Sequence, residues 1–312
     1  MTATSIISEI SVVIPLYNKA AEIERALRSV LEQSVQPCEV IVVDDGSTDG
    51  SAEIVERIAS PIVRLVRQTN AGVSAARNRA IEMAAGRWIA LLDGDDWWQK
   101  DYLANMAWLI ERYPDCGAYG SGFYVDNGRG LVVGDTPQSE GVVDFFEESM
   151  QRYVLIPSAT IVRRDLVMQL GGFPVGMRMG EDQYLWTRIA RVADVAFTPK
   201  TNVVYSRAAS NRSASIYRPE QSKYSLEDLY DESASEISNE YVARVALGKA
   251  LVESVRGGTQ AAQRAVDFFA YNKMSHRIAR KVRFFNSLPT FMRPAISAIY
   301  NWLAWTIARK GI

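Results

Sequence analysis

Three carboxylates gather in one short turn, Asp93-Gly94-Asp95-Asp96, which directly follows the apolar run Trp88–Leu92. Like charges this close repel and raise one another's pKa unless a cation neutralises them. Mg²⁺ or Mn²⁺ takes one or two protein carboxylates and completes its coordination with water and substrate phosphate oxygens. The turn therefore predicts a clamp for a metal-bound diphosphate. The alternative is that Asp95 or Asp96 only caps a helix over Lys100–Arg112.

A second apolar run, Glu39–Asp44, also ends in adjacent carboxylates, Asp44 and Asp45. Ser47 or Asp49 can cap the helix that follows this run. Capping does not account for the pair of carboxylates, whereas a ligand N–H group, such as the imide of a uracil, would account for one of them.

Two further segments carry charged groups that could serve a ligand. Asn70–Arg79 opens a helix and includes Arg77, so it is either a cationic segment that faces phosphate or an ordinary capped helix. Glu181 and Asp182 begin a helix, where the helix dipole alone stabilises a carboxylate. Because His276 is the only histidine, catalysis would rest on carboxylates.

The elements that must position these groups are short strands alternating with helices. Four β-branched apolar runs are typical of strands covered on both faces: Ile10–Pro15, Glu39–Asp44, Ile62–Arg67 and Trp88–Leu92. The spacing of apolar residues between them predicts helices, so the fold class is α/β with a doubly wound, mostly parallel sheet flanked by helices. Ligands of such sheets bind beyond the carboxyl ends of the strands. Three of the four runs end there in polar residues, one of them in Tyr17-Asn18.

The composition is that of a folded globular chain. Its 312 residues, 48% of them hydrophobic, can bury a full core. A formal charge of -1 gives no global electrostatic reason to expect nucleic acid as a partner. Two cysteines, Cys38 and Cys116, are too few for a disulfide framework, which predicts a reducing compartment, by default the cytoplasm. The N-terminal residues do not have the pattern of a secretory signal.

Five segments, in this order, resemble the signatures of glycosyltransferase family 2, whose members have a GT-A fold. They are SVVIPLYN (Ser11–Asn18), VVDDGSTD (Val42–Asp49), NAGVSAARN (Asn70–Asn78), LLDGDD (Leu91–Asp96) and GED (Gly180–Asp182). Five motifs in family order are far more specific than any one of them. Two departures are the alanine at position 80, where a glycine is usual, and the absence of the QxxRW signature of processive synthases. The second departure favours the addition of one sugar per encounter.

The resemblance implies a role for each matching residue. Asp93 and Asp95 would form the DxD motif, with Asp95 or Asp96 on a Mn²⁺ or Mg²⁺ ion, and Asp182 would be the catalytic base beside Glu181. The remaining implied residues would bind the donor nucleotide: Pro15, Tyr17 near the base, Asn18, Asp44, Asp45 at the Watson-Crick edge, Asn70, Arg77 and Asp93.

The resemblance also implies a reaction and a division of the chain. The expected reaction moves one sugar from a nucleotide-sugar donor, expected to be a UDP-sugar, to a hydroxyl of a saccharide or lipid-linked acceptor in surface polysaccharide or glycan biosynthesis. One base without a second carboxylate nucleophile predicts inversion at the anomeric carbon. The alternatives are a polyprenyl-phosphate sugar synthase of the same fold and a non-catalytic nucleotide-sugar-binding protein. Residues 1–125 would bind the donor, 126–215 the acceptor, and 216–312 would form a helical extension.

The C-terminal segment is basic. No acidic residue follows Asp267, so the segment beyond it carries a charge of +8 and the rest of the chain -9. The fifteen uncharged residues between Arg293 and Arg309 would extend about 22 Å as a helix, short of the roughly 30 Å hydrocarbon core of a bilayer. Trp302 and Trp305 beside clustered cations predict a helix in the interface of an anionic leaflet, that is, peripheral membrane contact. The alternative is packing on the catalytic domain or in a homo-oligomer.

Overall fold

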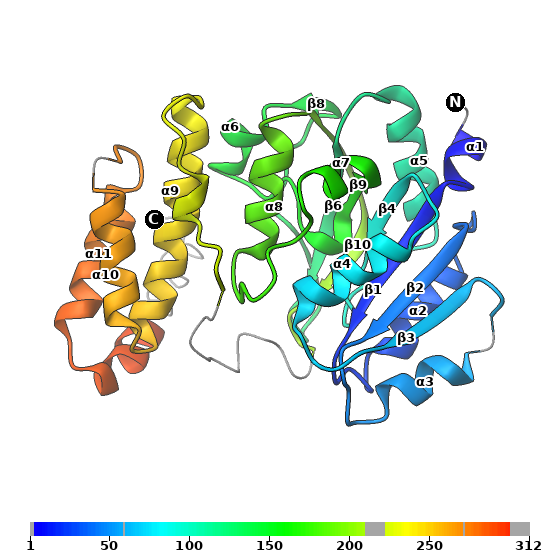
Figure 1. Ribbon diagram of the computed structural model, residues 1–312, viewed down its shortest axis with the longest axis horizontal. Helices are drawn as coiled ribbons and strands as arrows, with labels where there is room; N and C mark the ends of the chain where they lie inside the picture. Colours follow the sequence, from blue (N-terminus) through cyan, green and yellow to red (C-terminus); the bar gives the residue numbers. More distant parts are fainter. Residues whose placement is uncertain (1–2, 59, 210–221, 271, 300–312) are drawn as a thin grey trace. The chain divides into compact units, whose positions relative to one another are not determined.

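The computed structural model describes residues 3–58, 60–209, 222–270 and 272–299. It contains two compact units, the first comprising residues 1–216 and 220–224 and the second residues 217–219 and 225–312. The first unit is a layered α/β structure and the second is helical (Figure 1). The expected donor and acceptor halves, residues 1–125 and 126–215, both lie in the first unit, and the boundary between them falls inside strand β6 (Ala118–Asp126).

The first half of the sheet is parallel, as the sequence predicts. Its strand order is β3-β2-β1-β4, and all three pairings are parallel. The strands are β1 (Ile10–Leu16), β2 (Glu39–Asp44), β3 (Val63–Arg67) and β4 (Trp88–Leu91). Each of the four predicted runs is therefore a strand, with bounds that differ by one residue at most.

The second half of the sheet is mixed. The order continues β9-β6-β10-β5, with β9 antiparallel to both β4 and β6, and with β10 parallel to β6. These strands are β5 (Trp97–Trp98), β6, β9 (Thr160–Arg163) and β10 (Val195–Ser206), and two short strands, β7 (Leu131–Val133) and β8 (Gly141–Val143), pair with β6 and β10. The whole is a mixed α/β sheet with helices against it.

Helices of the first unit connect these strands. They are α1 (Ala3–Ile7), α2 (Ile23–Leu31), α3 (Ser51–Arg57), α4 (Val73–Met83), α5 (Tyr102–Arg112), α6 (Phe145–Ser149), α7 (Arg164–Gln169) and α8 (Glu181–Ala190), with a 3₁₀ turn η1 at Pro157–Ala159. Helix α5 begins two residues later than the apolar pattern suggests, and its N-cap residue is Asp101. Neither Asp95 nor Asp96 caps it, because β5 lies between the acidic turn and the helix.

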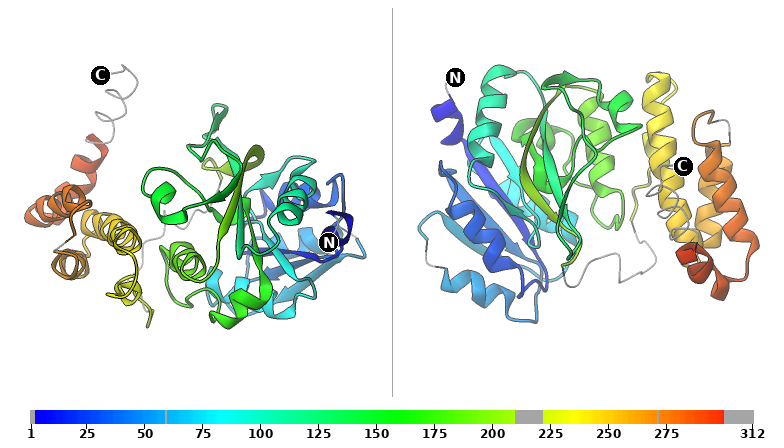
Figure 2. Two further views of the ribbon diagram at one scale, coloured as in Figure 1. Left: turned by 90° about the horizontal axis from the view of Figure 1, so that it is seen from above. Right: turned by 180° about the vertical axis from the view of Figure 1, so that it is seen from behind.

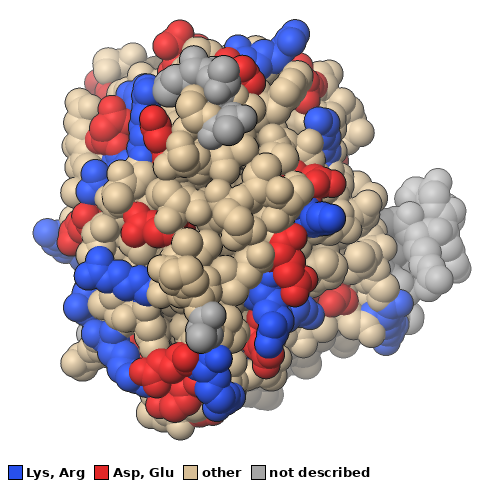
Figure 3. Space-filling view, turned by 90° about the vertical axis from the view of Figure 1, so that its right-hand side faces the viewer, with Lys and Arg blue, Asp and Glu red and all other residues tan. Residues whose placement is uncertain are grey.

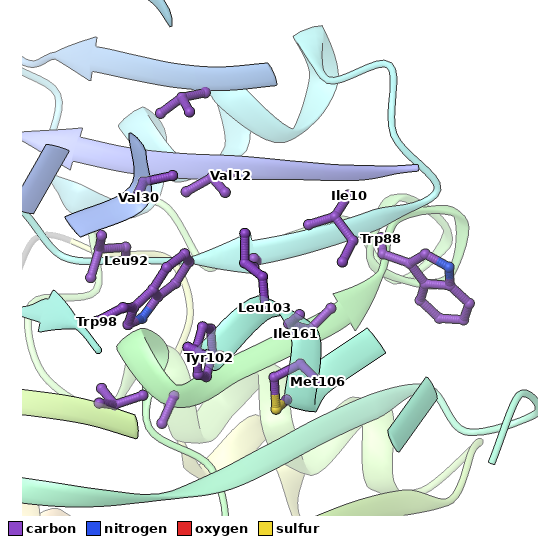
Figure 4. Close-up of a cluster of buried hydrophobic side chains, with 14 of the residues drawn as sticks. Ile10, Val12, Val30, Trp88, Leu92, Trp98, Tyr102, Leu103, Met106 and Ile161 are labelled. Carbon is purple, nitrogen blue, oxygen red and sulfur yellow. The ribbon is translucent and has the colours of Figure 1, made fainter. Parts of the chain in front are cut away.

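A buried apolar cluster fixes the end of β4, from which the acidic turn emerges (Figure 4). Ile10 and Val12 of β1, Trp88 of β4 and Leu92 just beyond it pack with Leu103 of α5, and all are fully buried. On the other side of the turn, the rings of Trp98 and Tyr102 lie 4.3 Å apart. The turn is thus held at both ends by packed aromatic and aliphatic side chains.

The loop between α4 and β4 approaches the start of β1 so closely that only glycine fits at position 86. The Gly86 N–H donates to Ser11 Oγ at 2.9 Å, and a Cβ atom there would lie 2.5 Å from the Glu9 carbonyl oxygen. Ser11 Oγ in turn donates to Glu39 Oε1, which also accepts from the Ala85 N–H. This network anchors the end of the segment that carries Arg77.

Among its described residues, the second unit has three long helices, α9 (Glu236–Val255), α10 (Thr259–Phe268) and α11 (His276–Ser287), with short 3₁₀ turns η3 (Glu227–Leu229) and η4 (Thr290–Met292). The three helices lie side by side in both views of Figure 2. The predicted helical character of this region is confirmed for the described residues. The carboxylate of Glu240 accepts hydrogen bonds from the N–H groups of Lys273 and Met274, which fixes the loop before α11.

The face shown in Figure 3 mixes basic and acidic side chains without a large area of one sign. Exposed ion pairs of this kind join Arg67 of β3 to Glu53 and Glu56 of α3. Pairs so exposed stabilise a fold by less than about 1 kcal/mol each, so apolar packing holds these elements in place.

We predict that Gly86→Ala lowers the free energy of unfolding by about 1–3 kcal/mol, because the added methyl group meets main-chain atoms that cannot move independently. Gly248→Ala in α9 is the control, since nothing lies within 4 Å of its Cβ position. That change should be neutral or slightly stabilising, because alanine favours helix. Urea denaturation of both variants measures the difference, and equal stability would contradict the close approach.

Candidate active site

The polar ends of three strands lie at one edge of the sheet. Leu16 of β1 is in register with Asp44 of β2, and Val13 of β1 with Leu91 of β4. Because these neighbours are parallel, the residues that follow each strand emerge together. The structure therefore confirms that Tyr17-Asn18, Asp44-Asp45 and the acidic turn share this edge.

Arg77 joins the acidic turn to the start of α8. Its guanidinium Nη2 lies 2.7 Å from Asp93 Oδ1, and its Nη1 lies 3.3 Å from Glu181 Oε1. The arginine side chain is 3% exposed, against 27% for Asp93 and 15% for Glu181. Its guanidinium lies 5.1 Å from the centre of the Phe173 ring. A helix with an arginine at this position thus brings together carboxylates 88 residues apart in the sequence.

Asn78, the next residue of α4, holds the loop that leads to α8. Its side-chain amide donates to the Phe173 carbonyl and accepts from the Phe173 N–H, both at 2.8 Å. Gly172 adopts a φ of 72°, and a Cβ atom there would clash with Asn78 Oδ1 at 2.5 Å. The Ala-Arg-Asn segment of the sequence therefore ties the two halves of the first unit together through both polar residues.

The carboxylates at the start of α8 are shifted toward the neutral form. Burial, with the Asp182 charge second, raises the pKa of Glu181 to about 7. Burial also raises the pKa of Asp182, although the positive charge of Arg77 opposes the shift. A raised pKa makes a carboxylate a stronger base at neutral pH. The sequence predicted a base with this property at Asp182.

Asp95 has a cation of its own. Lys19 Nζ lies 2.7 Å from Asp95 Oδ2, and the two side chains are only 12% and 18% exposed. Arg25 of α2 donates from Nη2 to the Asp95 carbonyl oxygen at 2.9 Å. Burial and the charge of Asp93 raise the pKa of Asp95. The turn is therefore crowded with negative charge, and its neighbours supply positive charge to balance it.

Asp96 supports the turn from inside. It is 1% exposed, and its oxygens accept hydrogen bonds from Ser158 Oγ at 2.5 Å and from the Ser206 N–H at 2.8 Å. Ser158 Oγ also accepts from the Asp93 N–H at 3.1 Å. Burial, with the charges of Asp95 and Asp93, raises the pKa of Asp96 well above its usual value. These contacts assign Asp96 to the packing of the turn against η1 and β10.

The donor set of the turn fits a hard cation that shares its ligands with a substrate. Among the described residues, no three His, Cys, Asp or Glu side chains converge as a closed metal cage. Mg²⁺ and Mn²⁺ do not require one, because one or two carboxylates together with phosphate oxygens and water complete their coordination. The carboxylate of Asp95 is 18% exposed, whereas that of Asp96 is buried, so Asp95 fits this role better.

The carboxylates that end β2 bind the chain itself. Asp44 Oδ1 accepts from the Ser47 N–H at 3.1 Å. Asp45, 3% exposed, accepts from Gln68 Nε2 and from the N–H groups of Ala71 and Gly72 at 2.7–2.8 Å. N–H groups of the chain itself thus bind Asp45, and its expected contact with the donor base stays a prediction. Gly50 is the N-cap residue of α3, and Asp49, one of the two predicted capping residues, accepts from the Ser51 N–H at 3.0 Å.

Two asparagines fix the neighbouring loops. Asn18 has a left-handed φ of 51° and accepts from the Thr48 N–H at 2.8 Å, which joins the ends of β1 and β2. Asn70 donates from Nδ2 to the Asp45 carbonyl oxygen at 3.0 Å. Between these loops Tyr17 is 42% exposed and presents an aromatic face at the sheet edge. Pro15 lies in β1 beyond its pairing with β4, where a missing N–H costs no ladder bond.

Sequence reasoning missed Lys19, Arg25 and Ser158. Lys19 directly follows the Tyr17-Asn18 motif, which is the one local signal that could have identified it. Ser158 contacts Asp96 across 62 residues of sequence, and no local pattern marks such a contact. The partners of Arg77 were also unexpected. The sequence assigned this side chain to phosphate, whereas its guanidinium is paired with the carboxylates of Asp93 and Glu181. Its Nε atom is buried and has no acceptor among the described residues.

We predict that Arg77→Met lowers the free energy of unfolding by about 3 kcal/mol, because it leaves two buried carboxylates without their cation. Arg79→Met in the same helix is the control. It should cost less than about 0.5 kcal/mol, since Arg79 donates to two uncharged oxygens, the Arg67 carbonyl and Gln68 Oε1. Adding Glu181→Gln to Arg77→Met should recover part of the loss. Equal costs for Arg77→Met and Arg79→Met in urea denaturation would contradict the bridge.

Comparison with known proteins relates this site to a family. The model of Glycosyl transferase family 2 matches residues 11–171, just over half of the chain. Glycosyltransferase GlyA of Streptococcus pneumoniae serotype 4 is 27% identical over 245 residues, which are 74% of this chain and 35% of that protein. The putative teichuronic acid biosynthesis glycosyltransferase TuaG of Bacillus subtilis is 43% identical over 107 residues, 33% of this chain and 42% of that protein. The matched part of this chain thus spans well under half of either relative.

Solved structures share the fold. S. aureus TarS 1-349 in complex with UDP-GlcNAc superposes with a TM-score of 0.66 at 21% identity, covering 89% of this chain and 88% of that one. The mannosyltransferase PcManGT from Pyrobaculum calidifontis, in complex with GDP-Man and Mn²⁺, gives a TM-score of 0.52 at 22% identity, covering 95% and 80%. These likenesses show a GT-A fold. Because the family model matches more than half of this chain, the chain belongs to glycosyltransferase family 2.

Proposed function

We propose that the chain is an inverting, metal-dependent glycosyltransferase that moves one sugar from a UDP-sugar to a hydroxyl of a saccharide or lipid-linked saccharide acceptor in the synthesis of a surface polysaccharide. The observation that carries this proposal is the Arg77 bridge, which brings the acidic turn and the Glu181-Asp182 pair to one edge of the sheet. The name of TuaG supports a role in polysaccharide synthesis, and the ligand of TarS supports a UDP-sugar.

The donor nucleotide belongs at the ends of β1 and β2. The exposed ring of Tyr17 offers a stacking face for the base, while Asp45, Asn18 and Asn70 hold the loops around it. We assign Asp45 to this support because its oxygens already accept three hydrogen bonds. These residues bind and orient the nucleotide without taking part in proton transfer.

The diphosphate belongs at the acidic turn. We assign Asp95 as the carboxylate that holds Mn²⁺ or Mg²⁺, with Asp93 beside it. The ion, when bound, supplies Lewis-acid stabilisation of the leaving diphosphate. The Mn²⁺ complex of PcManGT supports a divalent ion at a site of this fold. Asp96 keeps the turn in place through its hydrogen bonds with Ser158 and Ser206.

Asp182 acts as the general base. An acceptor hydroxyl is a poor nucleophile until a positioned carboxylate takes its proton. Burial raises the pKa of Asp182, so the group is a better proton acceptor than an exposed aspartate. Glu181 is held by Arg77, which leaves Asp182 as the carboxylate of the pair that can meet the acceptor. A single base and no second carboxylate nucleophile imply direct displacement, and therefore inversion.

We predict that UDP-GlcNAc with Mn²⁺ raises the melting temperature of the wild-type chain, because a ligand that binds only the native state stabilises it. Asp95→Asn should abolish the metal-dependent part of the shift. Asp182→Asn should keep the shift but lower hydrolysis of the donor by about 100-fold or more, since it lacks only the base. Differential scanning fluorimetry and detection of released UDP make the two measurements.

Three outcomes would change the proposal. GDP-mannose stabilising the chain where UDP-GlcNAc does not would replace the donor class. Undiminished turnover in Asp182→Asn would favour a lipid phosphate acceptor, which needs no base, and an anomeric signal of retained configuration in the proton NMR spectrum of the product would refute inversion. If the chain neither binds nor hydrolyses either donor, the proposed function itself is refuted. Glu227→Gln, a change of a carboxylate in the second unit, is the control, and it should behave as wild type in both measurements.

We further propose that the helical unit contacts an anionic membrane surface. Helix α11 carries the exposed cations Arg277, Arg280 and Arg283 together with Phe284, which is 53% exposed, and Phe291 of η4 is 84% exposed. Cations beside exposed aromatic groups are typical of interfacial helices. No helix within the described ranges has the length and apolar character needed to cross a bilayer.

One cation of the expected basic tail has a different role. Arg293 is 4% exposed and donates to the Ser254 and Leu288 carbonyl oxygens and to Thr259 Oγ1, so it ties helix ends together inside the unit. It cannot contribute to a membrane surface. The tryptophans at positions 302 and 305, on which the sequence prediction also rests, lie outside the described residues.

We predict that the full chain floats with phosphatidylglycerol vesicles at low salt and is released at about 0.5 M salt, because screening weakens attraction to anionic lipid. The pair Phe284→Ser and Phe291→Ser should reduce flotation severalfold. Val192→Ser, in the first unit, removes an apolar group of 62% exposure as the control. Absence of flotation together with a dimer in analytical ultracentrifugation would favour an interface between copies of the chain instead.

A further inference from the structure

The two outer carboxylates of the acidic turn are paired with cations of different kinds. Arg77 serves Asp93 from a fully buried position and is shared with Glu181. Lys19 serves Asp95 at 2.7 Å from a position 12% exposed. A guanidinium with two carboxylate partners is a fixed part of the framework. An ammonium group on a flexible four-carbon stem can exchange one oxygen partner for another.

The main chain of Lys19 is fixed while its side chain extends to Asp95. Its N–H donates to Ser51 Oγ at 2.8 Å, and its carbonyl oxygen accepts from the N–H groups of Glu22 and Ile23 at 2.9–3.0 Å. The ammonium group can therefore move by rotation of the side chain alone, without any shift of the loop. Its range includes the space beside Asp95, where the proposed function places the diphosphate.

The turn does not depend on Lys19 to keep its shape. Arg25 donates to the Asp95 carbonyl oxygen, and Ser158 receives the Asp93 N–H. If the ammonium leaves Asp95, these contacts still hold the main chain of the turn where it is.

We propose that Lys19 is the resident counter-cation of Asp95, that it competes with the divalent metal ion for this carboxylate, and that the metal ion therefore binds tightly only together with the donor diphosphate. The inference rests on the proposed function. An ammonium group and a divalent cation on one carboxylate repel each other, so binding of the metal requires Lys19 to leave. The negative diphosphate gives the ammonium a new partner, which makes the exchange favourable.

Binding of Mn²⁺ alone, followed by electron paramagnetic resonance of the free ion, tests the competition. Without nucleotide, Lys19→Met should bind Mn²⁺ about tenfold more tightly than wild type, because the competitor is gone. Lys19→Arg should stay near wild type, since it keeps a cation at Asp95. Lys200→Met is the matched control, because Lys200 donates to Asn105 on another element and contacts no carboxylate of the turn.

Saturating UDP provides the second comparison. It should tighten Mn²⁺ binding to wild type by a larger factor than to Lys19→Met, since only wild type has an ammonium to displace. A melting curve in EDTA and in Mn²⁺ adds a readout that needs no activity: Mn²⁺ should raise the melting temperature of Lys19→Met more than that of wild type. Lys19→Gln replaces Lys19→Met if the latter does not fold.

The outcomes separate the inference from the function on which it rests. Equal Mn²⁺ affinity of wild type and Lys19→Met, with UDP tightening both alike, overturns the competition and leaves the metal-dependent function standing. No Mn²⁺ binding by any variant, with or without UDP, overturns both. Tighter binding to Lys19→Met that persists when Asp95→Asn is added would place the metal ion elsewhere and would also overturn the inference.

Discussion

The candidate site depends on the charge of Arg77 inside the first unit. A buried guanidinium costs desolvation energy, and two carboxylates repay that cost only if both are held close to it. Asp93 comes from the end of β4 and Glu181 from the start of α8, so the ion pairs fix the distance between two parts of the sheet edge. Asn78 adds a neutral clamp on the loop between them. The positions of turn and helix are therefore set by electrostatics from the core, before any ligand binds.

This arrangement limits what each carboxylate can do. Arg77 is paired with Asp93 and Glu181, Ser158 and β10 enclose Asp96, and the partner of Asp95 is Lys19. Our proposal therefore gives proton transfer to Asp182 and metal binding to Asp95, whose ammonium partner can move. Burial, together with neighbouring negative charge, raises the pKa of Asp95, Asp96 and Glu181, which favours either bound protons or nearby cations. A negatively charged substrate that binds together with a cation would complete the charge balance of the site, which the side chains of the chain neutralise only in part. The chemistry proposed for the site follows from which carboxylates have been left available.

The sequence predicted the parallel half of the sheet because each strand there is a continuous apolar run with a polar end, and such runs have no other stable place. It could not predict the antiparallel insertion of β9, a strand of only four residues between the 3₁₀ turn η1 and helix α7. Residues at the strand ends were identified correctly as a group. Their partners were not, since Lys19 meets Asp95 across 76 residues and Ser158 meets Asp96 across 62. Pairings of this kind are products of tertiary packing, and local spacing contains no record of them.

Asp45 shows that a motif carboxylate can serve the chain itself. A strand that ends in two carboxylates looks like an acceptor for something outside the chain, and Asp45 also receives N–H groups from the loop before α4. These bonds satisfy two main-chain donors of that loop. They also place the start of α4, and with it Arg77. The family signature at this position therefore supports the bridge at the centre of the site.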